Sequence, residues 1–424
     1  MEHRYASKRG CMDFLMHMVA IDSWLSGSRG QVYMQPAKLD ADAPGNLISY
    51  GRESYYKPDP LPPSQDLALD DDFYETLADA TFWLGKLSGV SLELDFPPVL
   101  YTSLLRKEAM ESAEIEGADV DYDALYSLET RTFDEGRDEP SETTAAAETK
   151  DTREVLNYET AVKEGIDALD AGEELNVELL HDLHETLLTG VPDDRVDTDT
   201  IGDYKTNPNY LGDFLPPAPG AVEDLMDGLF TYYRTGGSYH PLVDIALFHY
   251  QFETIHPYGD GNGRLGRLLI TLQLYDADLL ERPNLYLSEY LNRNKTTYVE
   301  RMEGVRFHGE WEAWLSFFIE GIARQAHESV ERTRALADLR REYEHEYGGK
   351  AYTKNQLAVT LFEQPYITSK TVQRLFDIEQ STASRAINEL VNEGILEEVP
   401  RHGRNKEYRA REIFEILEQP PQTY

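Results

Sequence analysis

The segment 256–267, with the sequence HPYGDGNGRLGR, carries most of the residue types that could do chemistry. Its glycines Gly259, Gly261 and Gly263 permit backbone conformations with positive φ and let a ligand approach main-chain N–H groups closely. A helix that begins directly after these glycines would add the positive end of its dipole. The segment therefore predicts a site for an anion such as a phosphate.

The side chains of the segment extend this interpretation. Arg264 and Arg267 are three residues apart, so on a helix they share a face and can both bind phosphate oxygens. Asp260 lies at the mouth of the glycine turn, where a Mg²⁺ ion would bridge it to a diphosphate. Asn262 could either donate to a phosphate or hold the loop closed. His256 is placed to act as a general base near neutral pH. The set indicates transfer of a nucleotidyl or phosphoryl group to an acceptor that has to lose a proton.

Two helices are expected to position this segment. Apolar residues recur at helical spacing from Leu242 to Ile255 before it, and from Leu265 to Leu272 after it. The second helix would begin at the glycine turn and direct its first N–H groups toward the anion. A Walker A phosphate-binding loop is excluded, because no Gly-Lys-Ser/Thr follows the glycines.

The segment resembles the signature of Fic-domain proteins, which is a His, an aromatic residue, an acidic residue, Gly-Asn-Gly-Arg and a second Arg three positions on. Tyr258 stands where Phe is usual. The resemblance implies a mainly α, Fic-type helical bundle that uses ATP and Mg²⁺ to transfer AMP to a Ser, Thr or Tyr hydroxyl of a target protein. It implies His256 as the base, Asp260 as the Mg²⁺ ligand and Arg267 as the contact of the γ-phosphate. For Tyr298 the family position implies stacking near the adenine, whereas aromatic residues on such helices more often belong to the core. The implied phosphate cradle consists of Gly261, Asn262, Gly263 and Arg264.

A second motif lies on a helix expected from about Pro98 to Gly117. Ser112 and Glu116 are four residues apart and therefore share one face of that helix. With Gly117 they resemble the inhibitory motif of Fic proteins, whose Glu pairs with the second Arg of the signature, here Arg267. A carboxylate on Arg267 would compete with the γ-phosphate for the same charge. The alternative is a solvated helix face in a very acidic protein.

The segment from Asp193 to Pro219 is rich in Gly, Pro and Asn and has no helical period. It resembles the flap of Fic proteins, a small β-hairpin on which a target segment adds as a strand. The family commonly has Arg in place of Lys205, so a bidentate contact is not expected there. A plain surface loop is the alternative. The target contacts that the resemblance implies are Lys205, Asn209, Tyr210, Leu211 and Gly212.

His181 and His184 are three residues apart on the helix before this segment. One face of that helix could offer both to a metal ion. No third ligand is near in the sequence, so we expect them to pack or cap instead.

Residues 350–424 form a separate unit beyond Gly348 and Gly349, after a buried helix over Trp311–Ile322 and a charged helix over Gln325–Tyr347. Their helices and strands resemble a winged helix-turn-helix. Such folds contact DNA, but they also serve as protein-docking or dimerising modules, and high salt weakens binding driven by phosphate contacts. Both roles, and a homodimer, stay open. The DNA contacts would be Ser381, Thr382, Ser384 and Arg385 in a major groove, with Arg401 and Arg404 on the wing.

The composition is strongly acidic, with 78 acidic and 40 basic residues among 424 and a formal net charge of −38. Such a chain repels itself at low ionic strength, whereas in molar salt the Debye length falls to about 3 Å. We therefore expect the salt-rich cytoplasm of a halophilic microbe; an ordinary acidic protein is the alternative.

The one cysteine, Cys11, excludes a disulfide within the chain. No apolar run approaches the ~20 residues of a membrane span, so we expect a cytoplasmic protein without a membrane partner.

Four parts are expected along the chain. Residues 1–65 form an extension and an arm, and the distinct charge of the first 33 leaves open a start at Met34. Residues 66–150 form a helical region with the inhibitory motif, residues 151–347 the Fic catalytic core, and residues 350–424 the winged helix-turn-helix. The expected function is a self-inhibited protein adenylyltransferase. The alternatives are a Fic-type enzyme that uses another phosphate donor or removes AMP, and a transcriptional regulator whose core senses nucleotide.

Overall fold

The structure is a computed structural model of the whole chain, and it describes residues 39–51, 53–93, 98–119, 122–135, 150–191, 200–211, 214–400 and 406–418. Within these ranges the chain is mainly helical, as expected, with two small antiparallel sheets. None of the described helices is long and apolar enough to cross a membrane. Several predictions on single residues lie outside the described ranges, namely those for Cys11, Met34, Gly212, Arg401 and Arg404.

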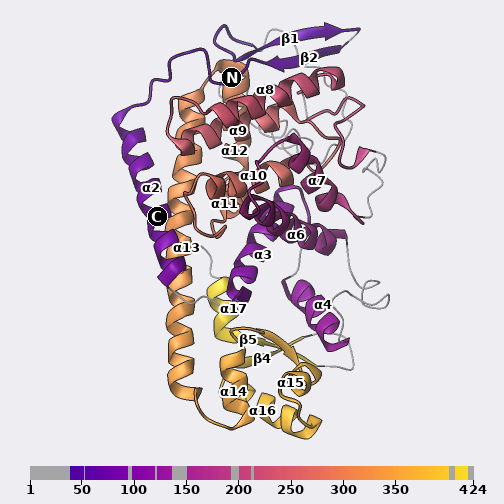
Figure 1. Cartoon of the computed structure of the whole chain (residues 1–424), viewed down its shortest axis with the longest axis vertical. Helices are drawn as coiled ribbons and strands as arrows, with labels where there is room; N and C mark the ends of the chain where they lie inside the picture. The colour runs from indigo at the N-terminus through magenta and orange to yellow at the C-terminus, as the bar shows by residue number, and fades with distance from the viewer. Residues whose placement is uncertain are drawn as a thin grey trace, which may run out of the picture.

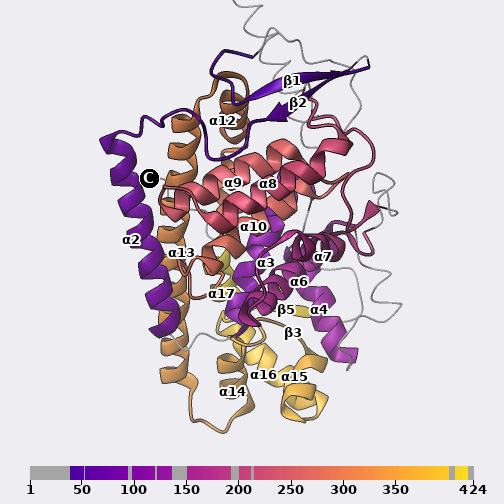
Figure 2. The same ribbon diagram turned by 45° about the horizontal axis from the view of Figure 1, so that its top comes forward.

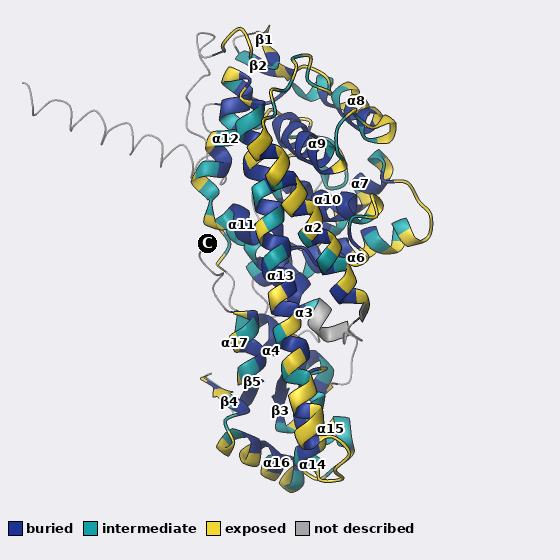
Figure 3. Cartoon of the chain, turned by 90° about the vertical axis from the view of Figure 1, so that its left-hand side faces the viewer, coloured by how far each residue is buried: buried dark blue, intermediate teal, exposed yellow. Residues whose placement is uncertain are grey.

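Two buried helices meet at the glycine turn, as the apolar spacing predicts. α9 (Pro241–Ile255) begins with a proline, whose missing N–H is no loss in a first turn, and ends at His256. α10 (Asn262–Asp276) begins directly after Gly261. Both helices are buried around most of their circumference and lie in the dark blue, buried centre of Figure 3.

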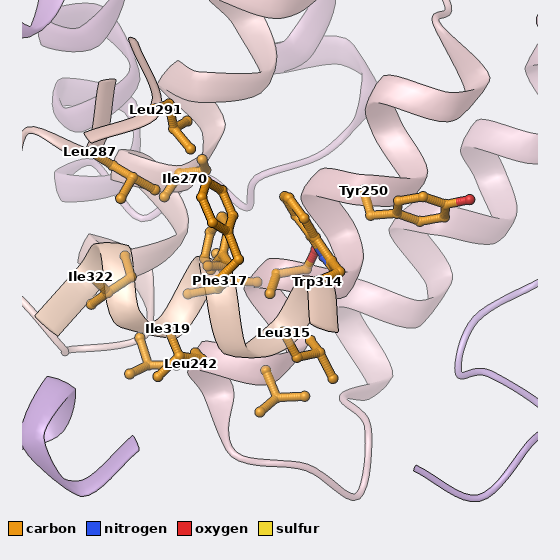
Figure 4. Close-up of a cluster of buried hydrophobic side chains, with 14 of the residues drawn as sticks. Leu242, Tyr250, Ile270, Leu287, Leu291, Trp314, Leu315, Phe317, Ile319 and Ile322 are labelled. Atoms are coloured by element: carbon orange, nitrogen blue, oxygen red, sulfur yellow. The ribbon is translucent and has the colours of Figure 1, made fainter. Parts of the chain in front are cut away.

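The remaining helices of the body enclose α9 and α10 in two hydrophobic clusters that meet at these two helices. Figure 4 shows part of the first cluster, which contains Leu242 and Tyr250 of α9, Ile270 of α10, and Trp314 and Phe317. Burial from both sides fixes the ends of α9 and α10, and so fixes the turn between them. The enclosing elements are α6 (Lys150–Asp170), α7 (Val177–Leu188), the 3₁₀ helix η3 (Pro219–Ala221), α8 (Val222–Thr235), α11 (Leu287–Arg293) and α12 (Lys295–His308).

One helix, α13 (Trp311–Tyr347), runs for 37 residues along the body and continues into the C-terminal unit (Figure 1). The sequence predicts two helices here, and this prediction is wrong. No Gly or Pro lies between Ile322 and Gln325, so only the composition changes at that point and the backbone hydrogen bonds continue. The first half packs into the body, and α2 (Asp71–Glu93) lies alongside.

The N-terminal part of the described chain is a β-hairpin followed by three helices. β1 (Gly45–Tyr50) pairs antiparallel with β2 (Glu53–Pro58), and the N–H of Tyr56 donates to the carbonyl of Leu215 at 2.9 Å. Part of the expected arm is thus a hairpin held against the segment that follows Lys205. α3 (Pro98–Ile115) and α4 (Tyr122–Glu135) come after α2.

The C-terminal unit has the element order helix, strand, helix, helix, strand, strand, helix. Its sheet has the order β3-β5-β4, with both pairings antiparallel, and residues 377–379 join α15 to α16. The assignment as a winged helix-turn-helix stays a prediction. Its elements are α14 (Thr353–Thr360), β3 (Tyr366–Thr368), α15 (Ser369–Phe376), α16 (Gln380–Asn392), β4 (Leu396–Val399), β5 (Glu407–Ala410) and α17 (Arg411–Leu417).

This unit is less separate from the body than the sequence suggests. Leu104 of α3 and Leu336 of α13 belong to the hydrophobic cluster of the C-terminal unit. Asp134, at the end of α4, accepts hydrogen bonds from the hydroxyl groups of Thr368 and Thr371 at 2.6 and 2.8 Å. In Figures 1 and 2 α3 lies between α10 and α17, so one helix touches both the glycine turn and the C-terminal unit.

Candidate active site at the turn between α9 and α10

The backbone of the turn presents free N–H groups at the start of α10. Gly261 has a φ of 77°, a left-handed conformation that favours glycine. The first bond of the helix runs from the N–H of Leu265 to the carbonyl of Gly261 at 3.0 Å. Within the described ranges, no acceptor lies on the N–H groups of Asn262, Gly263 and Arg264. These three groups and the helix dipole make the start of α10 attractive to an anion.

Asn262 closes the turn rather than pointing its amide outward. Its Oδ1 accepts from the N–H of Tyr258, and its Nδ2 donates to the carbonyl of the same residue, both at 2.9 Å. Of the two roles predicted for Asn262, the structure shows the one in which the side chain holds the loop closed.

Both arginines of the signature are buried and already have partners from the protein. Arg264 forms ion pairs with Glu154 of α6 at 3.2 Å and with Asp260 at 3.7 Å. Arg267 donates from Nε to Oγ of Ser112 at 2.8 Å and from Nη2 to the carbonyl of Ser112 at 2.9 Å. Both arginines lie in the first turns of α10, as predicted, but each guanidinium group is already bound by other residues of the protein.

Glu116 lies where the sequence motif places it, on Arg267. Its Oε1 is 2.8 Å from Nη2 of Arg267, and α3 ends directly before it, with a left-handed Gly117 at φ 91°. The same carboxylate lies so close to the first turn of α10 that a Cβ added to Gly263 would overlap its Oε1. The carboxylate of Glu116 therefore occupies the place that an anion bound to the start of α10 would take.

His256 caps the end of α9 with a φ of 50°, an uncommon conformation for a residue other than glycine. Burial lowers the pKa of its imidazole to about 3, nearby Lys205 adds to this shift, and the carbonyl of Glu253 opposes it. The imidazole is therefore neutral at physiological pH and can accept a proton. Negative charge from a bound nucleotide would raise its pKa toward the working range.

Asp260 fits a magnesium ion that arrives with a nucleotide. One of its carboxylate oxygens accepts from the N–H of Gly261 at 2.8 Å, and the side chain is partly exposed beside the free amides. Among the residues that the structure describes, no three His, Cys, Asp or Glu are grouped so that they could hold a metal. Mg²⁺ is commonly bound by one or two carboxylates together with phosphate oxygens and water. The residues present suit that arrangement and not a metal held by the protein alone.

Two histidines of α7 support the turn, which confirms their predicted packing role. The ring of His184 stacks on that of Tyr258 at 3.8 Å, its Nδ1 accepts from the N–H of Gly202 at 3.0 Å, and its Nε2 donates to the carbonyl of Asp260 at 3.1 Å. Burial lowers the pKa of His184 to about 4, so the ring is neutral at physiological pH. His181 bonds to the hydroxyl of Tyr258 at 3.0 Å through Nδ1.

The structure does not expose the side chain of Lys205 to a target, so the expected contact stays a prediction without support from that side chain. The residue is 3% exposed, and its ammonium points into the turn. Leu211 is also buried, and Tyr210 donates from its hydroxyl to Glu53 of the hairpin at 2.6 Å. In the described part of the expected flap, the only pairing is an isolated antiparallel bridge between Leu211 and Phe214, so a regular β-hairpin is not formed there. The exposed tip of the segment is Thr206, Asn207 and Pro208.

Tyr298 has a place in the core. It is 1% exposed, and its hydroxyl lies 2.9 Å from Nε2 of His249. The structure favours this alternative over stacking on an adenine.

On the distant C-terminal unit, the residues predicted to contact DNA lie on exposed or half-exposed positions of α16. They are Ser381, Thr382, Ser384 and Arg385.

Comparison with known families bears on this geometry. The sequence model of the Fic/DOC family matches residues 174–274, which include α9, the turn and most of α10. The chain contains a Fic/DOC domain. The model of the Fic/DOC family N-terminal region matches residues 74–167, which include α3 and Glu116. The Fic/DOC signature and the helix that covers it thus come from two matched regions.

Relatives of the Fic/DOC domain include "Protein adenylyltransferase Fic" of Drosophila ananassae, 32% identical over 126 residues. The protein of the same name from Drosophila willistoni is 34% identical over 128 residues. Each match covers 29% of this chain and 24% of the relative, so the chain spans about a quarter of the length of these relatives. Among solved structures, a Fic family protein from Desulfovibrio desulfuricans G20 aligns over 81% of this chain and 97% of its own, at 18% identity and a TM-score of 0.51. That likeness concerns the fold alone.

Proposed function

We propose that this chain is a protein adenylyltransferase that moves AMP from ATP to the hydroxyl group of a Ser, Thr or Tyr in a target protein. One observation carries the proposal. A neutral imidazole, three free main-chain N–H groups and two buried guanidinium groups converge on one turn. This set suits a polyphosphate and an acceptor that must lose a proton. The name shared by the matched relatives supports the same reaction.

In this reaction the acceptor oxygen attacks the α-phosphorus, and the bond from that phosphorus to the leaving pyrophosphate breaks. His256 takes the proton of the hydroxyl. The amides of α10 and the guanidinium groups of Arg264 and Arg267 hold the phosphate oxygens and orient the α-phosphate. Asp260 would hold a Mg²⁺ ion, which would supply positive charge for the leaving pyrophosphate.

We propose further that the enzyme inhibits itself through Glu116. Its carboxylate uses the charge of Arg267 and stands over the start of α10, so a γ-phosphate cannot occupy the same place. Activation then requires Glu116 to leave. The carboxylate is partly exposed, so it can leave without crossing the core.

Purified protein incubated with Mg²⁺ and ATP labelled on either the α- or the γ-phosphate tests the reaction class. We expect the α label alone to stay on protein, more strongly in Glu116→Gly than in the wild type, and not at all when His256→Ala is added. Retention of the γ label would indicate phosphoryl transfer instead. Equal α labelling of the wild type and Glu116→Gly would remove self-inhibition from the proposal.

The link between α3 and the C-terminal unit supports a second candidate, a transferase regulated through that unit. Lys107 of α3 donates to the carbonyl of Leu417 at 3.4 Å and to Glu289 at 3.0 Å, and Leu104 packs in the C-terminal cluster. A partner that shifts this unit would move the helix that ends at Glu116. If α15 and α16 act as a helix-turn-helix, the partner would be DNA. The alternative partner is a second copy of this chain or another protein. Retarded migration of promoter DNA in molar salt, lost in Arg385→Glu, would favour DNA.

A further inference from the structure

A single short segment holds the backbone on both sides of His256. The carbonyl groups of residues 255, 256, 257 and 258 are consecutive, and each accepts a hydrogen bond from Lys205 or Asn209. Lys205 provides three of these bonds, from Nζ to Ile255 at 3.2 Å, from Nζ to His256 at 2.8 Å and from its main-chain N–H to Pro257 at 2.9 Å. Asn209 provides the fourth, from Nδ2 to Tyr258 at 2.9 Å.

The ammonium of Lys205 is an unusual donor for this place. It is buried, and no carboxylate forms an ion pair with it in the part of the chain that the structure describes. Its three N–H donors are all used, because Oδ1 of Asn209 accepts the third at 2.8 Å. Two of the acceptors are the carbonyl groups of Ile255, the last residue of α9, and of its cap His256, where the negative end of the helix dipole favours a cation. Burial lowers the pKa of Lys205 to about 7, and these dipoles compensate for the missing counter-ion.

The need for such a clamp follows from the conformation of His256. A residue with a side chain at a φ of 50° is strained and keeps that conformation only where its surroundings impose it. The backbone angles of His256 set the direction in which its imidazole leaves the chain. A group that fixes the carbonyl groups of residues 255–257 therefore fixes the imidazole.

We infer that Lys205 is a positioning residue for His256: its side chain holds the end of α9 so that the imidazole faces the acceptor, without itself contacting nucleotide or target. The inference rests on the proposed function as far as catalysis is concerned. The positioning itself is a property of the resting protein. Lys205 contacts neither Arg267 nor the amides of α10, so its loss leaves the phosphate cradle in place.

Three variants in the Glu116→Gly background test the catalytic part. Lys205→Met keeps an unbranched apolar stem and removes the ammonium, Lys205→Arg keeps a cation with several donors, and Lys57→Met removes an exposed lysine of β2 as a control. We expect Lys205→Met to lower kcat for AMP transfer by roughly 10- to 100-fold, as for a small misplacement of a reacting group, with KM for ATP changed much less. Lys205→Arg is expected to restore most of the rate, and Lys57→Met to match its parent.

A second measurement does not depend on activity. In protein labelled at histidine, the ring resonances of His256, assigned by their loss in His256→Ala, should move in Lys205→Met and stay in place in Lys57→Met. If they do not move, Lys205 does not position the imidazole. A Lys205→Met protein that is folded and as fast as its parent would also overturn the inference. If even Glu116→Gly transfers no AMP, the proposed function fails, whereas the resonances still decide the role of Lys205.

Discussion

Oε1 of Glu116 lies 2.8 Å from Nη2 of Arg267, although 151 residues separate them in the chain. The same guanidinium donates to the hydroxyl and the carbonyl of Ser112. One turn of α3 thus uses the cation that the proposed reaction needs for the γ-phosphate. Under the proposed function, Glu116 would therefore stand where a phosphate of the nucleotide binds.

This relationship predicts the effect of Glu116 on nucleotide affinity. In Glu116→Gln the side chain keeps its size and loses its charge, so it no longer competes as an anion. Hydrogen bonds to charged groups contribute about 1.5–3 kcal/mol, so we expect ATP to bind roughly 10- to 100-fold more tightly, measured by calorimetry. Glu114→Gln is the matched control, since Glu114 lies on the same helix and bonds to Asn292. Equal affinities for wild type and Glu116→Gln would contradict the competition.

Gly266 is predicted to be intolerant of alanine because of Glu253. A Cβ at Gly266 would overlap Oε1 of Glu253 and lie 3.1 Å from a ring carbon of Phe252, and both neighbours are buried. We expect Gly266→Ala to lower the free energy of unfolding by about 1–3 kcal/mol in denaturant titration, as other overpacked sites do. Gly228→Ala in α8 meets no atom within 4 Å and should gain up to about 1 kcal/mol. A neutral or stabilising Gly266→Ala would show that Glu253 can move aside.

Glu253 also predicts a pH dependence. Burial raises its pKa from 4.5 to about 8, with Arg267 opposing the shift. Between these two values the folded protein keeps a proton that the unfolded chain has lost, so this residue contributes stability below pH 4.5 that is lost as the pH rises toward 8. Glu253→Gln removes the effect. We expect the stability of the wild type relative to Glu253→Gln to fall from pH 5 to pH 8; a constant or rising difference would contradict the shifted carboxyl group.

The hydroxyl of Tyr258 is predicted to be dispensable for the chemistry. It bonds to His181, while the ring stacks on His184. Tyr258→Phe should therefore cost about 1 kcal/mol of stability and leave kcat for AMP transfer unchanged. Tyr258→Ala, which removes the stacked ring, should lose both stability and activity. Loss of labelling in Tyr258→Phe would instead assign the hydroxyl to the reaction.

The sequence predicts the parts of this site that lie close together in the chain. Gly261, Asn262 and Arg264 stand at the start of a helix because glycines and apolar spacing dictate it. The contact of Glu116 with Arg267 could be predicted only from the resemblance to a family motif. The spacing of Ser112 and Glu116 shows only that the two residues share a helix face.

The support of His256 could not be predicted in the same way. Lys205 and Ile255 are 50 residues apart, and a lysine in a polar, glycine-rich segment is usually exposed. Its burial depends on the unpaired carbonyl groups at the end of α9, which only the folded chain brings near it. Asp134 and Thr368 meet across 234 residues for a similar reason, so the attachment of the C-terminal unit is also not visible in the sequence.

The most direct test of the central claim is the intact mass of the protein after incubation with ATP and Mg²⁺. Self-labelling reports the chemistry without knowledge of the target. We predict that Glu116→Gly gains the mass of AMP on one or more hydroxyl side chains, that the wild type gains less, and that Glu116→Gly with His256→Ala gains none. An unchanged mass for Glu116→Gly, or the same gain without His256, would contradict an adenylyltransferase held in check at Arg267.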